Sequence, residues 1–215
     1  PFMQVFLATH VDQQWKDTYI NSLIALAGPH GGAPVTAEQI AAGTNFGISL
    51  FDTSTMKRVI RRLGSPVWML PEETNTDVMF ITPQRNYTGA QLKDFFRDMN
   101  DTVIYDMYKA QKKAGNMALP PGVPTWCLYG FDVPTILSVS MSSVDPPTTE
   151  VPKVVGIGMG DQTVPLYSLA VCDGWAKQQS QPVIVERFSN VTHSTIMTEE
   201  IVFKKILQII TADKF

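Results

Sequence analysis

Two side chains in the C-terminal third of the sequence have the types and positions that acid–base chemistry requires. Asp161 follows a short apolar segment, residues 154–157, in the run Gly-Met-Gly-Asp-Gln-Thr-Val-Pro. His193 follows a second apolar segment, residues 183–188, in the loop Ser-Asn-Val-Thr-His. If both segments are parallel strands, the two side chains lie beyond strand ends, where open α/β sheets gather their chemistry.

An acid that precedes a histidine follows the chain order of the α/β-hydrolases, in which the nucleophile comes first. The 32 positions between Asp161 and His193 leave room for one crossover between neighbouring strands. Structural alternatives stay open, because aspartate beside glycine is typical of turns and a lone histidine is more often structural than catalytic. As an ordered pair, the two residues predict the acid and the base of a hydrolase-type site.

A serine nucleophile in this fold needs a strained elbow, usually Gly-x-Ser-x-Gly, that lifts its hydroxyl above the sheet. No serine of the sequence lies in that pattern. We therefore expect the nucleophile to stand before Pro1, and residues 1–11 to be the tail of a longer helix. On this interpretation the chain, expressed alone, is inactive and poorly soluble.

The elements that must position these residues alternate between strand and helix patterns, which predicts an α/β fold with a mainly parallel sheet. Strands are expected over residues 19–27, 78–82, 125–129, 154–157 and 183–188. Helices are expected over residues 3–11, 52–63 and 103–113. Three more helices are expected to begin at a Thr-x-x-Gln capping box at Thr36, at Thr88 and at Thr198. Residues from about 36 to 123 are rich in helix patterns, which predicts a cap inserted between core elements. Residues 1–215 together are expected to form a partial α/β-hydrolase domain that lacks the N-terminal region with the nucleophile.

Composition narrows the class of protein and its compartment. With 44% hydrophobic and 17% charged residues, the chain is expected to form a core. A net charge of −3 without a stripe of Lys or Arg argues against nucleic-acid binding. No apolar run approaches the roughly 20 residues that span a bilayer.

Three Asn-x-Ser/Thr acceptor sites, at Asn86, Asn100 and Asn190, accompany an even number of cysteines, Cys127 and Cys172. Two cysteines alone are also compatible with buried thiols. Together, these features favour a secreted or lumenal location, in the lysosome, vacuole or endoplasmic reticulum, where glycans are added and a disulfide persists.

Several short segments occur in an order that covers nearly the whole chain: Trp-Lys-Asp at 15–17, Gly-Pro-His-Gly-Gly-Ala at 28–33, Ser-Pro-Val-Trp-Met-Leu-Pro at 65–71, Pro-Gly-Val at 121–123, Cys-Leu-Tyr-Gly at 127–130, Val-Pro-Thr at 133–135 and Gly-Asp-Gln-Thr-Val at 160–164. As a set they resemble the lecithin:cholesterol acyltransferase family, which includes lysosomal phospholipase A2 and the phospholipid:diacylglycerol acyltransferases. Two positions depart from the family pattern: Gln162 stands where glycine is usual, and His30 where tryptophan is usual.

The resemblance implies that the chain is the C-terminal half of an α/β-hydrolase fold, with Asp161 as the triad acid and His193 as the base. It also implies a disulfide between Cys127 and Cys172, which in the loop-entropy model contributes about 4 kcal/mol. The implied activity is serine-dependent acyl transfer through an acyl-enzyme, with neither a metal nor an organic cofactor. A phospholipid is the implied donor, and a sterol, diacylglycerol, another alcohol or water the acceptor, at a membrane or lipoprotein surface reached by N-terminal elements.

Two other classes of function remain open. The first is a non-catalytic lipid-binding relative of the same fold that has lost the serine. The second is a complete structural or interaction domain, which would have to protect an exposed sheet edge.

Overall fold

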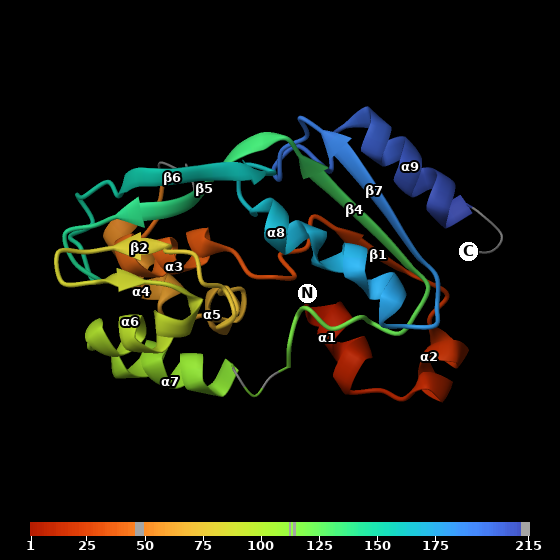
Figure 1. The fold of residues 1–215 in the computed structure, drawn as a ribbon, viewed down its shortest axis with the longest axis horizontal. Coiled ribbons are helices and arrows are strands. Elements are labelled where there is room, and N and C mark those ends of the chain that lie inside the picture. The colour runs from red at the N-terminus through yellow and green to blue at the C-terminus, as the bar shows by residue number, and fades with distance from the viewer. Residues whose placement is uncertain (46–49, 112, 114, 212–215) are drawn as a thin grey trace. The chain divides into compact units, whose positions relative to one another are not determined.

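The computed structural model describes residues 1–45, 50–111, 113 and 115–211. The chain forms two compact units. The first comprises Pro1–Gly31, Gly115–Thr135 and Gly158–Phe215; the second comprises Gly32–Ala114 and Ile136–Ile157. Each unit has its own sheet and its own set of helices (Figure 1).

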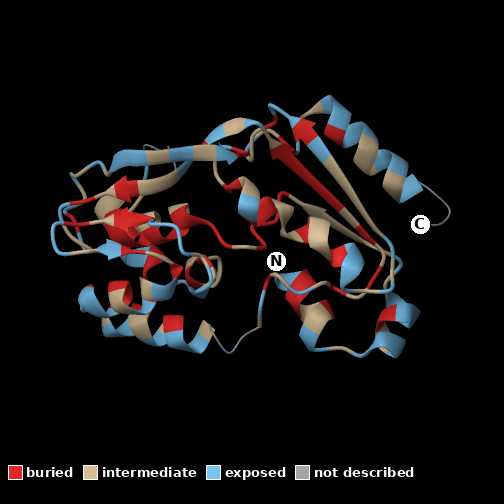
Figure 2. Ribbon diagram, viewed as in Figure 1, coloured by how far each residue is buried: buried red, intermediate tan, exposed pale blue. Residues whose placement is uncertain are grey.

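The first unit is built on a parallel sheet of β1 (Leu23–Leu26), β4 (Thr125–Phe131) and β7 (Val183–Ser189), in the order β1-β4-β7. The described helices of this unit are α1 (Phe2–Thr9), α2 (Gln13–Tyr19), α8 (Leu166–Leu169), the 3₁₀ helix η2 (Ala170–Lys177) and α9 (Glu200–Thr211). The central strand, β4, has a nearly continuous apolar sequence, as expected for a strand of a parallel sheet that is covered on both faces, and Figure 2 shows it as largely buried.

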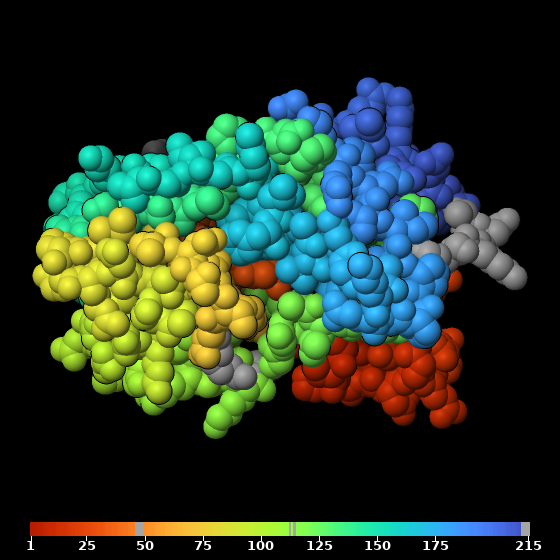
Figure 3. All heavy atoms as spheres, viewed as in Figure 1, coloured from red at the N-terminus to blue at the C-terminus, as the bar shows by residue number. Residues whose placement is uncertain are grey.

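Helices cover the strands of this sheet. In the space-filling view the blue atoms of α8 and η2 lie in front of the strands, so that little of β4 is visible (Figure 3). The last helix, α9, is fastened by Lys205, which forms an ion pair with Glu186 of β7 and lies 4.9 Å from the ring centroid of Trp126 on β4. An acid in the first turn of α9, Glu200, complements the positive end of the helix dipole.

The second unit contains a mixed sheet in the order β3-β2-β5-β6. Its strands are β2 (Phe80–Ile81), β3 (Asn86–Tyr87), β5 (Val133–Ser140) and β6 (Lys153–Gly160), of which β2 pairs antiparallel with β3 and parallel with β5. Its described helices are α3 (Pro34–Ala42), α4 (Thr53–Ile60), α5 (Gly64–Trp68), the 3₁₀ helix η1 (Gly89–Gln91), α6 (Leu92–Asp98) and α7 (Thr102–Gln111). The first residues of β5 and the last of β6 belong to the first unit.

The core of the second unit forms where the helical periodicity of the sequence predicts an apolar face. Leu92, Phe95, Phe96 and Met99, spaced for one side of a helix, are all buried. Phe95 stacks on Phe80 of β2 with ring centroids 5.0 Å apart, which joins α6 to the sheet.

The α/β fold with a mainly parallel sheet is confirmed, and two local predictions are wrong. The strand expected over residues 19–27 is shorter, Leu23–Leu26, because Tyr19 is the last residue of α2, whose N-terminus the carboxylate of Asp12 caps by accepting the N–H of Trp15 at 2.8 Å. The capping box at Thr36 is also wrong: α3 begins at Pro34, and the Thr36 hydroxyl donates to the carbonyl of Ala33.

The helix expected over 103–113 ends at Gln111 in the structure, and residue 112 lies outside the described residues. The second unit overlaps the range of about 36–123 expected to form a cap, and that role stays a prediction.

Candidate active site

The loops that carry Asp161 and His193 both follow the C-terminal ends of strands. Asp161 comes directly after β6, and His193 lies in the loop after β7. Both residues belong to the first unit. In open α/β sheets, catalytic and binding groups gather at this edge.

The two side chains meet. The Nδ1 of His193 lies 2.7 Å from the Oδ2 of Asp161, and the backbone N–H of His193 donates to the carbonyl oxygen of Asp161, also at 2.7 Å. The acid is therefore joined to the base twice, once through the side chains and once through the main chain.

The carboxylate of Asp161 is fully buried and held in one orientation. Its Oδ1 accepts the backbone N–H groups of Thr163, at 3.1 Å, and Val164, at 2.7 Å. This leaves Oδ2 for the imidazole of His193. Since a carboxylate oxygen accepts, Nδ1 carries a proton in this arrangement, and in the neutral imidazole Nε2 then keeps its lone pair.

The imidazole of His193 is buried on the side of Asp161 and accessible on the other. Its side chain is 38% exposed, whereas that of Asp161 is 0% exposed. In the part of the chain that the structure describes, no residue hydrogen-bonds Nε2 of His193. The nitrogen that a general base uses is thus accessible to a group from elsewhere.

One expectation about this pair is wrong. The strands before Asp161 and His193 are not neighbours, because β6 belongs to the four-stranded sheet and β7 to the three-stranded one. The strand β5 connects the two sheets. It follows β4 directly after Asp132, which has φ 63°, and its first residue, Val133, forms a parallel bridge with Asp161.

The residue after the acid has the backbone conformation that glycine favours. Gln162 has φ 80°, in the left-handed region, which costs an L-residue about 1–2 kcal/mol. Glycine is the residue that the resemblance led us to expect at this position, and the backbone of Gln162 adopts the conformation that a glycine there would adopt most easily. The surrounding hydrogen bonds must hold it there.

The loop that carries His193 crosses close to β4. The N–H of Asn190 donates to the carbonyl of Phe131 at 2.9 Å, and Asn190 has φ 60°. A Cβ on Gly130 would stand 2.0 Å from the carbonyl oxygen of Val191, so no larger residue fits at that position without moving the loop. Gly130 therefore allows the loop that carries His193 to run this close to β4.

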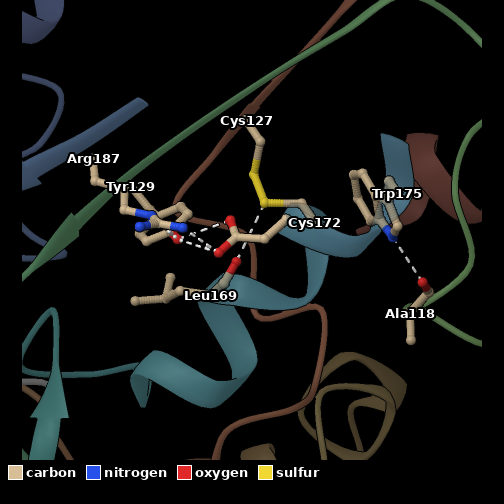
Figure 4. Close-up of a disulfide and its surroundings, with 8 residues drawn as sticks. Ala118, Cys127, Tyr129, Leu169, Cys172, Trp175 and Arg187 are labelled. Atoms are coloured by element: carbon tan, nitrogen blue, oxygen red, sulfur yellow. Dashed lines mark hydrogen bonds and ion pairs between the residues drawn. A yellow bond between two sulfur atoms is a disulfide. The ribbon is translucent and has the colours of Figure 1, made fainter. Parts of the chain in front are cut away.

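In the same unit, a disulfide joins Cys127 of β4 to Cys172 of η2 (Figure 4). Both cysteines are buried. The next residue, Asp173, accepts from the hydroxyl of Tyr129 and forms an ion pair with Arg187 of β7. These contacts hold the helical segment that follows the Asp161 loop against the sheet.

His30, which replaces the tryptophan of the family pattern, is packed in the interior of the first unit. It is 1% exposed, and its ring lies edge-on to Trp175 with centroids 4.6 Å apart. Burial lowers the pKa of His30 to about 4, so the imidazole is neutral at neutral pH. The structure gives it a packing position rather than a place beside Asp161 and His193.

The three acceptor asparagines, Asn86, Asn100 and Asn190, are exposed. No cluster of three or more His, Cys, Asp or Glu side chains placed for a metal occurs among the described residues. Within the same residues, no helix has the length and apolar character to cross a bilayer.

Taken together, the described geometry can orient a neutral imidazole and stabilise it once it takes a proton. The spacing and order of Asp161 and His193 pointed to this pair in the sequence. Thr135, whose hydroxyl accepts the N–H of Gln162 at 2.9 Å, was missed as a part of the site. Its presence in the Val-Pro-Thr segment was the only signal, and no sequence pattern links that segment to the acid loop.

Comparison with known proteins shows which proteins the sequence is similar to. The family model for lecithin:cholesterol acyltransferase matches residues 1–116 and 101–204. A phosphatidylcholine-sterol acyltransferase from Gallus gallus is 34% identical over 184 residues, which cover 84% of this chain and 44% of that protein. A lysosomal phospholipase A and acyltransferase from Bos taurus is 33% identical over 199 residues, which cover 91% of this chain and 48% of that protein. The chain thus spans a little less than half the length of these relatives.

Proposed function

The chain belongs to the lecithin:cholesterol acyltransferase family, and from that membership we propose that the intact protein transfers acyl groups from glycerophospholipid esters through a serine-bound acyl-enzyme. The observation that carries the proposal is the 2.7 Å contact between Nδ1 of His193 and the buried carboxylate of Asp161. That contact leaves Nε2 to act on a nucleophile.

In the proposed mechanism His193 is the general base and then the general acid. Its Nε2 takes the proton of the serine hydroxyl as the serine oxygen attacks the ester carbonyl, and it returns the proton to the departing alcohol of the lysophospholipid. The acceptor alcohol or water then loses its proton to Nε2 and takes the acyl group as the serine–acyl bond breaks, and Nε2 gives that proton to the departing serine oxygen. Asp161 orients the imidazole and stabilises its charged form without changing its own protonation.

The nucleophile of the proposal is a serine that none of the 215 residues supplies in the required elbow. The described residues also offer no pair of hydrogen-bond donors that we can assign to an oxyanion hole. Both groups come, in the proposal, from other parts of the intact protein. We further assign the second unit as the cap of this enzyme.

The substrate classes follow from the relatives. One relative is named for transfer from phosphatidylcholine to sterol, and another for phospholipase A and acyltransferase activity in the lysosome. These names support a phospholipid donor for this protein. The acceptors we propose are a sterol, diacylglycerol or another alcohol, with water giving phospholipase A activity.

A secreted or lumenal site of action fits this assignment. Three exposed Asn-x-Thr acceptors, at Asn86, Asn100 and Asn190, and a disulfide support passage through an oxidising compartment. One relative is lysosomal by name. We propose that all three asparagines carry glycans.

Replacement of His193 by alanine in the intact protein tests the function. Release of fatty acid and transfer to a sterol or alcohol should both fall to background, because no other group takes the serine proton. The assay uses vesicles of phosphatidylcholine with and without cholesterol. His10→Ala is the matched control, since His10 is an exposed histidine at the end of α1 and should leave turnover unchanged.

The near-UV circular dichroism of both variants should match that of the wild type, because His193 is half-exposed. Turnover retained in His193→Ala would rule out its role as the base. A wild-type protein that binds the vesicles without any turnover would instead favour a non-catalytic relative.

A further inference from the structure

One peptide group, between Asp161 and Gln162, connects the acid to the base. Its carbonyl oxygen accepts the backbone N–H of His193 at 2.7 Å. Its N–H, on the opposite side of the same plane, donates to the Oγ1 of Thr135 at 2.9 Å. Because a peptide group is planar, a donor or acceptor that fixes one end fixes the direction of the other.

This peptide group needs an anchor. Gln162 has φ 80°, a conformation that an L-residue adopts only when its surroundings hold it. Without a partner for its N–H, the group could rotate towards a more relaxed conformation. Rotation would turn the carbonyl of Asp161 away from His193.

The hydroxyl of Thr135 is placed to be that anchor. Thr135 is 1% exposed, and its Oγ1 donates to the carbonyl of Val133 at 3.0 Å while it accepts from Gln162. Both functions of the hydroxyl are therefore used. The approach is close, because a Cβ on Gly160 would stand 2.7 Å from Oγ1.

We propose that Thr135 is a positioning residue that holds both Asp161 and His193 in register by fixing the peptide group between Asp161 and Gln162. This inference rests on the proposed function, in which those two residues are the acid and the base. The recorded partners of the Thr135 hydroxyl are the carbonyl of Val133 and the N–H of Gln162, not the imidazole of His193. Thr135 acts by limiting the peptide group to one orientation.

The test compares two replacements of Thr135 in the intact protein. Thr135→Val keeps the shape and removes the hydroxyl, which takes away the recorded partner of the N–H of Gln162. Thr135→Ser keeps the hydroxyl. The valine variant should lose about 10- to 100-fold in kcat, because small displacements of catalytic groups have effects of that order, while KM for phosphatidylcholine stays unchanged. The serine variant should recover activity to near the wild-type value.

The chain offers a matched control in Thr125. It is also fully buried in the first unit, and its Oγ1 also donates to the carbonyl two residues earlier, that of Val123, at 2.8 Å. Its hydroxyl makes no recorded bond to the Asp161 loop. Thr125→Val should lower the melting temperature and leave kcat unchanged.

A spectroscopic reading separates positioning from general stability. The Nδ1–H proton of His193, hydrogen-bonded to Asp161, should give a downfield proton resonance that disappears in His193→Ala. The resonance should persist in Thr135→Ser and Thr125→Val and be broadened or lost in Thr135→Val. If Thr135→Val does not fold, Thr135→Ala, which removes the same hydroxyl with less bulk, takes its place.

Wild-type kcat in folded Thr135→Val, or equal losses of kcat in Thr135→Val and Thr125→Val, would overturn the inference. A failure of the proposed function looks different, because His193→Ala would then retain turnover. Loss of turnover in His193→Ala with full activity in Thr135→Val would reject the role of Thr135 alone.

Discussion

The carboxylate of Asp161 is buried, and each of its oxygens already has a partner. An asparagine at this position has the same shape but must present an NH₂ group either to the backbone donors or to the Nδ1–H of His193. In the first arrangement the NH₂ group faces the backbone N–H groups, donor against donor. In the second it faces Nδ1–H, a clash that is relieved only if the imidazole moves its proton to Nε2, which then has no lone pair for the serine proton.

We therefore expect Asp161→Asn in the intact protein to lower kcat by roughly 10³- to 10⁴-fold, as a wrong tautomer does in serine hydrolases, with little change in fold. The measurement is phospholipid turnover together with thermal melting. Asp132→Asn serves as the control, because Asp132 is exposed and keeps an acceptor for the hydroxyl of Ser189. A loss below tenfold in Asp161→Asn would contradict the assigned orientation of the imidazole.

Some residues of the candidate site could be predicted from the sequence, and others could not. Asp161 and His193 could be predicted as a pair because acid, histidine and the strand before each occur in a recognised order. Thr135 could not, since its contact with Gln162 depends on where β5 lies beside the acid loop. The positive φ of Gln162 was equally hidden, because glutamine gives no signal of a left-handed conformation.

Among the elements, η2 depends on a covalent link. Cys172 of η2 is joined to Cys127 of β4, and Asp173 next to it contacts Tyr129 and Arg187. Burial and the carboxylate of Asp173 raise the pKa of Tyr129 to about 12, so its hydroxyl stays a donor in this network. The disulfide and the network act on the same short helical segment.

Removal of the link by Cys127→Ala with Cys172→Ala should lower the free energy of unfolding by about 4 kcal/mol, since the closed loop spans 45 residues. Urea unfolding of the two proteins measures the difference. A reducing agent should destabilise the wild type and leave the double variant unchanged. A difference below about 1 kcal/mol would show that the noncovalent contacts of η2 suffice.

Helices and strands could be predicted from the sequence where a single apolar pattern specifies them. They could not be predicted where their position depends on individual side-chain contacts. The face of Leu92, Phe95, Phe96 and Met99 is confirmed because helical spacing alone specifies it. The strand β5 was missed, since Pro134 interrupts its pattern and proline argues against an interior strand. The first turn of α2 depends on one side chain, that of Asp12, whose capping bond no periodicity reveals.

On the scale of the whole molecule, burial of a histidine gives the stability a dependence on pH. Burial holds the folded-state pKa of His30 at about 4, below its ordinary value of 6.5, so the unfolded chain binds more protons between these pH values. Stability from this source is complete above pH 6.5 and decreases as the pH falls, by up to about 3 kcal/mol near pH 4.

Urea unfolding of the wild type and of His30→Phe at pH 7 and pH 4.5 should show this effect. The wild type should lose more stability than the variant on acidification, because phenylalanine has no proton to bind. His10→Gln, at an exposed position, should behave as the wild type does. Equal losses in wild type and His30→Phe would mean that His30 is charged in the folded state.

The residues described for the candidate site, among them Asp161, His193, Thr135 and the disulfide, all belong to the first unit. The hydrogen bonds between them are therefore formed within one compact part of the chain. A comparison of the two units by hydrogen exchange would report on this part separately from the second sheet and its helices.

The donors that hold the acid belong to the backbone of residues 163 and 164, not to their side chains. The side chain at position 163, which is not buried, can consequently change in evolution while its N–H still holds the carboxylate. Proline is the exception, because it alone has no N–H to offer. In a saturation library, position 163 should therefore accept a wide range of amino acids and reject that one.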